Sequence, residues 1–179
     1  MKLIIQRAKP NPAGKDTNRH KPLAAQLLGE TVDIENTDTK PVNLGKCRLA
    51  HTEFDAQGRA KPQPVIYWTG AAIELKPGEM VRIHTGKSKD VAEMHAEDKN
   101  GVHHHTYAES HSFVLNNKEG DKLYLYSETA LLDSASYDPA VGEGVTLIRK
   151  GDKLVAPAKS GGTGPWTAPA VIGTTGKAA

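Results

Sequence analysis

The sequence predicts an all-β protein built as an antiparallel β-sandwich of about seven to nine short strands. Turn-forming residues recur roughly every ten residues, and apolar and polar residues alternate between the turns. A period of two is typical of strands that bury one face. With 179 residues and 19.2 kDa, the chain suits a single domain with a flexible end.

The composition predicts a soluble protein with a small core. Hydrophobic residues make up 37% and aromatic residues 5% of the chain, and the mean hydropathy is −0.51. No segment is apolar for long enough to cross a membrane. Met1–Ile5 resembles the start of a signal peptide, but Gln6–Lys9 interrupts the apolar run. We therefore expect a cytoplasmic protein as the sequence is written, and an exported one only if a leader has been removed.

The charge distribution and the cysteine content bear on which partners the protein binds and on whether disulfides stabilise it. The net charge is +2, but residues 1–28 hold six basic residues and one acid. No aromatic residue lies among these bases, so the pattern lacks the stacking platform of a single-strand binder. We expect a solvated basic segment, and a nucleic-acid partner has no support. Cys47, the one cysteine, cannot form an internal disulfide and is expected to be a small buried hydrophobe.

The N-terminal part is predicted to hold a strand and a short helix. The first strand runs from Lys2 to Ala8, and the turn at residues 10–14 contains two prolines that exclude a helix there. Residues 23–28 form the one stretch with helical propensity, and Gly29 would end it. The alternative is that these residues lead directly into the next strand.

Two strands are predicted within residues 31–49. Val32 and Ile34 alternate with polar neighbours, and the turn formers 36–41 end this strand. In the next strand, Val42 and Leu44 have one phase and Cys47 and Leu49 the other. A bulge or sharp bend at residues 45–46 would return both pairs to the core.

The remaining strands follow the same alternation. They are expected at residues 65–68, 73–75, 80–84, 123–126 and 131–137. In 80–84, Val81 and Ile83 face the core, so Arg82 and His84 point outward. We assign residues 1–140 to the sandwich, 141–157 to an extra hairpin that turns at Gly151, and 158–179 to a disordered tail with too few apolar residues to order it.

Residues 86–112 show no periodicity and are predicted to be a long excursion between strands. Five of the eight histidines lie in it, namely His95, His103, His104, His105 and His111. If the histidine run is extended, His103 and His105 project to one face about 7 Å apart, which allows both to bind one zinc ion. His111 is our candidate for the third ligand, with His95 or Glu109 as alternatives. The competing interpretation is an exposed loop with solvated histidines.

Motifs for other chemistry are incomplete. Residues 84–88 end in Gly-Lys-Ser, but a phosphate-binding loop needs glycine at the position of Val81. No serine lies in a Gly-x-Ser-x-Gly motif, and Asp133 and Ser134 are expected to be structural. We therefore predict that the protein is not an enzyme.

Several motifs, in order along the chain, resemble the lamin tail domain family. The first is Glu30-x-Val32-x-Ile34-x-Asn36, followed by Pro41-Val42-Asn43-Leu44, Leu75-Lys76-Pro77-Gly78, residues 115–123 with Asn-x-x-Gly-Asp, and the strand 131–137. The resemblance implies an immunoglobulin-like sandwich. It also implies a free-standing, prokaryotic-type member, because the sequence has no heptad run that would form a coiled-coil rod.

Three functions remain open. The first is a non-enzymatic interaction module that contacts a protein, with nucleic acid or envelope components as alternatives implied by the resemblance. The second is a zinc site on the histidine-rich segment 95–111. The third is a structural or adhesion domain. Exposed sheet edges also permit a dimer, but nothing in the sequence selects an oligomeric state.

Overall fold

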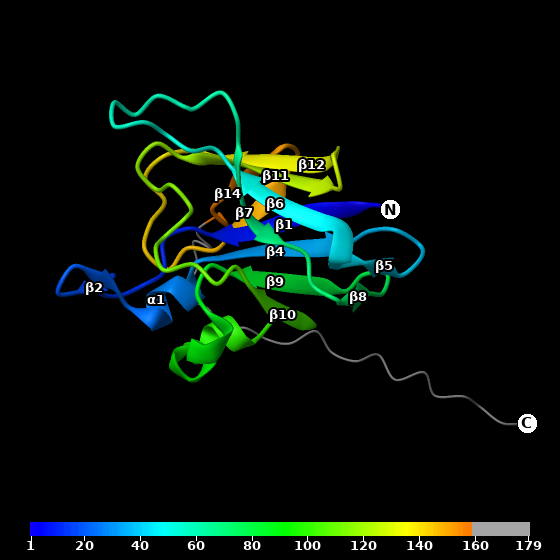
Figure 1. Cartoon of the computed structure of the whole chain (residues 1–179), viewed down its shortest axis with the longest axis horizontal. Helices are drawn as coiled ribbons and strands as arrows, with labels where there is room; N and C mark the ends of the chain where they lie inside the picture. The colour runs from blue at the N-terminus through cyan, green and yellow to red at the C-terminus, as the bar shows by residue number, and fades with distance from the viewer. Residues whose placement is uncertain (159–179) are drawn as a thin grey trace, which may run out of the picture.

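A computed structural model describes residues 1–158, so most of the predicted tail, 159–179, lies outside the described residues. Ten strands form one continuous sheet that is bent into two facing halves (Figure 1). In order across the sheet these strands are β10 (His104–Tyr107), β9 (Met80–His84), β4 (Thr31–Asn36), β1 (Leu3–Lys9), β13 (Leu147–Lys150), β14 (Lys153–Val155), β12 (Ala130–Tyr137), β11 (Asp121–Ser127), β6 (Cys47–His51) and β7 (Val65–Thr69).

Short elements connect these strands. They are two strand pairs, β2 (Thr17–Asn18) with β3 (Lys21–Pro22) and β5 (Val42–Asn43) with β8 (Glu74–Leu75), one helix, α1 (Ala24–Gly29), and three 3-10 helices, η1 (Leu44–Lys46), η2 (Ser88–Glu93) and η3 (Ala96–Lys99). The predicted helix at 23–28 is therefore confirmed. The bend predicted at 45–46 is η1, and the Asn43 side chain accepts a hydrogen bond from Gly45 N in it.

The two halves pack as a sandwich, which confirms the predicted fold class. On one side, the β13–β14 hairpin joins β1 to β12. On the other side, β5 pairs with β8, and Trp68 Nε1 of β7 donates to Thr106 Oγ1 of β10 at 3.3 Å. Two pairings are parallel, β9 with β10 and β12 with β14. The first and last strands of the sheet thus approach each other.

The hydrophobic core fills the space between the halves. Val32, Ile34, Leu49 and Cys47 are at most 1% exposed, as the alternation predicts. Trp68 is the largest fully buried side chain. Burial of apolar side chains on this scale is the main favourable contribution to folding.

The Asn-x-x-Gly-Asp motif builds the turn before β11. Asn116, directly before this motif of residues 117–121, accepts hydrogen bonds through its side chain from Lys118 N and Glu119 N, both at 3.0 Å. Asp121 accepts from Thr52 N at 2.9 Å, which ties the turn to the end of β6. Gly120 has φ +75°, and a Cβ there would lie 2.5 Å from Tyr137 O. The motif is therefore structural.

The Glu30 side chain connects the loop at residues 113–115 to the sheet. Its buried carboxylate accepts hydrogen bonds from Val114 N at 2.9 Å and Leu115 N at 3.1 Å, and the Thr85 hydroxyl also bonds to it. Burial raises the pKa of Glu30 to about 8, although these donors lower it. The glutamate of the family motif thus holds residues 113–115 against β4 and the end of β9.

We expect Gly120→Ala to destabilise the fold more than Gly78→Ala. Both glycines have positive φ, so each alanine costs about 1–2 kcal/mol of backbone strain. Only at position 120 does the new methyl group meet a backbone carbonyl, since nothing lies within 4 Å at position 78. Urea unfolding of the two variants measures the difference. Equal losses of stability would contradict this account of the turn.

Glu30 should also make stability depend on pH. Because its pKa is raised on folding, the folded state holds a proton that the unfolded state releases, so stability falls as the pH rises from about 4.5 to 8. His84, whose pKa is lowered to about 4, has the opposite effect below pH ~6.5. We therefore expect urea unfolding between pH ~7 and ~8.5 to show a decline in the wild type that is much smaller in Glu30→Gln. The same decline in both proteins would refute this role, and the exposed Glu128→Gln is the control.

Candidate functional site

The face of β1, β4 and β9 that points away from the core is polar and buried. A β-bulge between Ile5 and Arg7 shifts the phase of β1, so Ile5 and Ala8 enter the core while Arg7 and Lys9 point away from it. Asp33 in β4 and Arg82 in β9 point to the same side, and they are directly opposite in the register. Charged side chains from four chain segments, β1, β4, β9 and the residues near 98, therefore meet on one surface.

The prediction that Arg82 and His84 point outward needs a correction. Both face away from the hydrophobic core, but they are only 7% and 0% exposed. On this side of the sheet, helix α1 contacts β9, η2 packs on α1, and the residues around η3 lie next to Arg82 (Figure 1). Arg82 Nη1 donates to Asp98 O at 3.0 Å and Asn100 O at 3.1 Å. The aperiodic excursion therefore forms a cover for the sheet.

Asp33 is the centre of the ion pairs beneath this cover. Its two oxygens accept hydrogen bonds from Arg82 Nε at 2.7 Å and Nη2 at 2.8 Å, a bidentate pair. Arg7 Nε lies 2.9 Å from the same carboxylate, without the alignment of a hydrogen bond. Arg7 Nη2 donates to Gly101 O at 2.7 Å. Two guanidinium groups therefore share one carboxylate.

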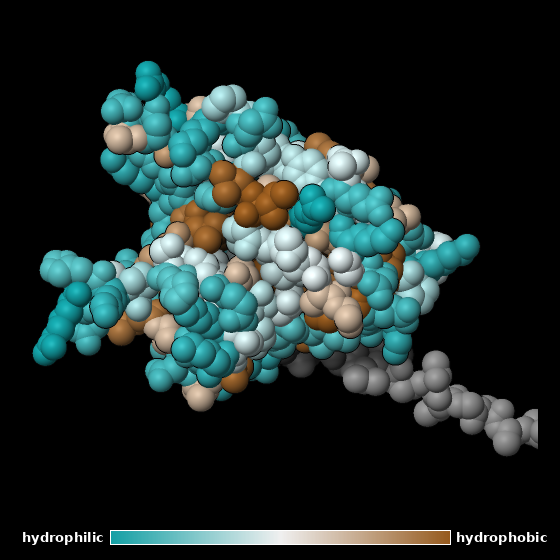
Figure 2. Space-filling view, viewed as in Figure 1, coloured by the Kyte–Doolittle hydropathy of each residue, from teal (hydrophilic) through white to brown (hydrophobic). Residues whose placement is uncertain are grey.

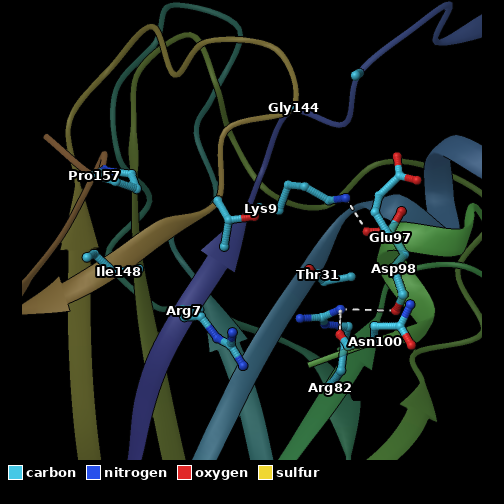
Figure 3. A pocket seen from close by; sticks show the side chains of 12 residues that line it. Arg7, Lys9, Thr31, Arg82, Glu97, Asp98, Asn100, Gly144, Ile148 and Pro157 are labelled. Carbon is cyan, nitrogen blue, oxygen red and sulfur yellow. Dashed lines mark hydrogen bonds and ion pairs between the residues drawn. The ribbon is translucent and has the colours of Figure 1, made fainter. Parts of the chain in front are cut away.

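A pocket of about 500 Å³ opens beside these ion pairs (Figure 3). Lys9 is 7% exposed and pairs with Asp98, which is 2% exposed. The expectation that Arg7 and Lys9 lie in a solvated basic segment is wrong, because the cover and β13 enclose them. The lining residues are Arg7, Lys9, Ala13, Thr31, Arg82, Glu97, Asp98, Asn100, Gly144, Thr146, Ile148 and Pro157.

His84 and His105 form a pair that the sequence analysis did not predict. His84 Nδ1 contacts Leu28 O, so the N–H lies on that nitrogen and Nε2 accepts from His105 Nδ1 at 2.9 Å. The two rings stack at 5.2 Å, and Tyr107 also stacks on His84 at 5.3 Å. Burial lowers the pKa of His84 to about 4 and also lowers the pKa of His105. Both imidazoles are therefore neutral near pH 7.

The three predicted zinc ligands have three different neighbours. His103 Nδ1 accepts a hydrogen bond from Met80 N at 3.1 Å, His105 bonds to His84, and His111 Nδ1 lies 2.8 Å from Lys87 Nζ. Within residues 1–158, no three His, Cys, Asp or Glu side chains are arranged to hold a metal ion. The alternative ligand Glu109 accepts from Ser88 N at 2.9 Å. The zinc site stays a prediction without support from this geometry.

Strand β7 presents a different kind of surface. It is the last strand in the sheet order, so its outer edge has no strand partner in the described part of the chain. Val65 and Ile66 are 39% and 46% exposed, and Figure 2 shows apolar side chains gathered over β7. A register shift between Leu49 and Ala50 makes Tyr67 the extra residue of a bulge.

Comparison with known proteins gives one family. The sequence model described as Lamin Tail Domain matches residues 1–139, which is more than half of the chain. No curated protein matches this chain. None of the helices in residues 1–158 is long and apolar enough to cross a membrane. The match agrees with the motifs at Glu30–Asn36 and 115–123 and with the sandwich, and we conclude that the chain belongs to the lamin tail domain family, whose fold is an immunoglobulin-like β-sandwich.

Proposed function

We propose that this lamin tail domain is a non-enzymatic interaction module that binds an extended, apolar segment of a protein partner along β7. The family supports an immunoglobulin-like module of interaction or structural type. The observation that carries the finer proposal is the terminal position of β7 together with the exposure of Val65 and Ile66. The free-standing, prokaryotic-type character of the domain stays a prediction.

An edge strand can bind a partner through its backbone. Unpaired N–H and C=O groups accept an added strand, and the side chains beside them select its sequence. Trp68, 2% exposed, anchors β7 in the core and holds this edge in place. The opposite terminal strand, β10, has no large exposed hydrophobic side chain. β7 is therefore the better docking edge.

The charges near β7 indicate an apolar partner segment. In the loop before β7, Arg59 Nε pairs with Asp55 at 2.8 Å and Lys61 Nζ with Glu53 at 2.8 Å. These exposed charges neutralise one another and leave little net field to select a charged segment. The exposed side chains of Val65 and Ile66 would then select an apolar partner segment.

The test compares two exposed side chains. We expect Ile66→Lys to abolish partner binding, because the charge would be buried under the added strand. Leu131→Lys should leave binding intact, since Leu131 is 54% exposed on β12, away from the β7 edge. Proteins captured from an extract of the source cells by each variant identify the partner. Calorimetry with the purified partner then measures each affinity.

Equal binding by the wild type and Ile66→Lys would contradict the β7 proposal while leaving the family assignment intact. Loss of binding in both variants would mean that the partner contacts a wider surface than one edge. Thermal unfolding of each variant alone controls for a loss of folding. Because Ile66 is already half exposed, we expect no large change in its midpoint.

A further inference from the structure

We propose that the pocket beside Arg7 and Lys9 binds a compact oxyanion, the phosphate or carboxylate group of a small molecule. The pocket lies on the outer face of β1, β4 and β9, and β7 belongs to the other half of the sandwich. The inference is therefore independent of the proposed protein-binding edge. It rests on the charge balance, the free donors and the shape of the pocket.

The buried and partly buried charges next to the pocket do not cancel. Three cations, Arg7, Lys9 and Arg82, face two carboxylates, Asp33 and Asp98. Lys9 pairs with Asp98, so the single carboxylate of Asp33 must serve both arginines. One positive charge is left over. The carboxylate of Glu97 also lines the pocket, but this residue is exposed, so solvent screens its charge.

Arg7 and Lys9 keep donors that no group within residues 1–158 uses. Arg82, in contrast, donates through Nε and Nη2 to Asp33 and through Nη1 to Asp98 O and Asn100 O. Arg7 uses Nη2 and leaves Nη1 without a hydrogen-bond partner within residues 1–158. Lys9 uses one ammonium donor of three. Arg7 and Lys9 are thus the residues that would bind an anion. Arg82 would contribute electrostatic attraction but no hydrogen bond.

The walls of the pocket also indicate what the anion is attached to. Ile148 and Pro157 lie across the pocket from Lys9 and Asp98 (Figure 3). Ala13 and Gly144 also line the pocket, and neither has a polar side chain. A volume of about 500 Å³ is in the range of small-molecule sites. We infer a ligand with one anionic group toward β1 and a small apolar part toward β13.

The experiment uses inorganic phosphate and isobutyrate as probes on the full chain. The thermal midpoint is measured at rising concentrations of each probe up to ~20 mM, against sodium chloride of equal ionic strength. We expect a saturable rise in the wild type that Arg7→Gln removes and Lys118→Gln keeps, because the Lys118 side chain is 91% exposed and does not line the pocket. Arg7→Gln leaves the bidentate Arg82–Asp33 pair in place, so it should fold.

The controls separate specific binding from a general salt effect. Phosphate stabilises most proteins by exclusion from their surface, and this effect would be the same in all three proteins. Equal shifts in the wild type, Arg7→Gln and Lys118→Gln would therefore overturn the proposal. If Arg7→Gln fails to fold, the amide chemical shifts of the wild type are followed as each probe is added, and they decide whether the pocket binds the anion. Saturable changes in residues 97–101 and 144–146 support the site, and their absence refutes it.

Discussion

The carboxylate of Asp33, which Arg7 and Arg82 share, makes the covered polar face of the sheet possible. A sheet face that carries Arg7, Arg82 and His84 would ordinarily stay in water, because burying a charge without a partner is costly. The bidentate bonds from Arg82 to Asp33, and the bonds from the same guanidinium to the carbonyls of residues 98 and 100, make burial tolerable. They allow residues 86–103 to lie on the sheet as a cover.

This arrangement separates the protein into a rigid frame and two surfaces with different chemistry. The frame is the apolar core between the sheet halves, closed by the β13–β14 hairpin on one side and by the Trp68–Thr106 hydrogen bond on the other. One surface is the apolar edge of β7. The other is the polar pocket next to β1, where charge rather than apolar area is available. Protein and small-molecule ligands would therefore not compete for one place.

The fold could be predicted from the sequence because its signals are local. Alternation identified the core faces of β4 and β9, and the phase slip between Leu44 and Cys47 required the bend that η1 provides. The polar face could not be predicted, since alternation shows on which side Arg82 lies but not what covers that side. The histidine run suggested a metal site, yet the partner of His105 comes from β9, and parallel pairing leaves no local pattern. Opposite charges at outward positions of β4 and β9 were the one available signal, because the bulge in β1 reverses the phase that alternation gives to Arg7 and Lys9.

Amide hydrogen exchange in Asp33→Asn tests whether the Asp33 carboxylate holds the cover on the sheet. The substitution keeps the size of the side chain but removes the negative charge that the two arginines share. We expect faster amide exchange in residues 94–103, because the cover loses its attachment, while β11 and β12 exchange as in the wild type. Unchanged exchange in residues 94–103, or an equal increase throughout the sandwich, would contradict the role of Asp33 in holding the cover.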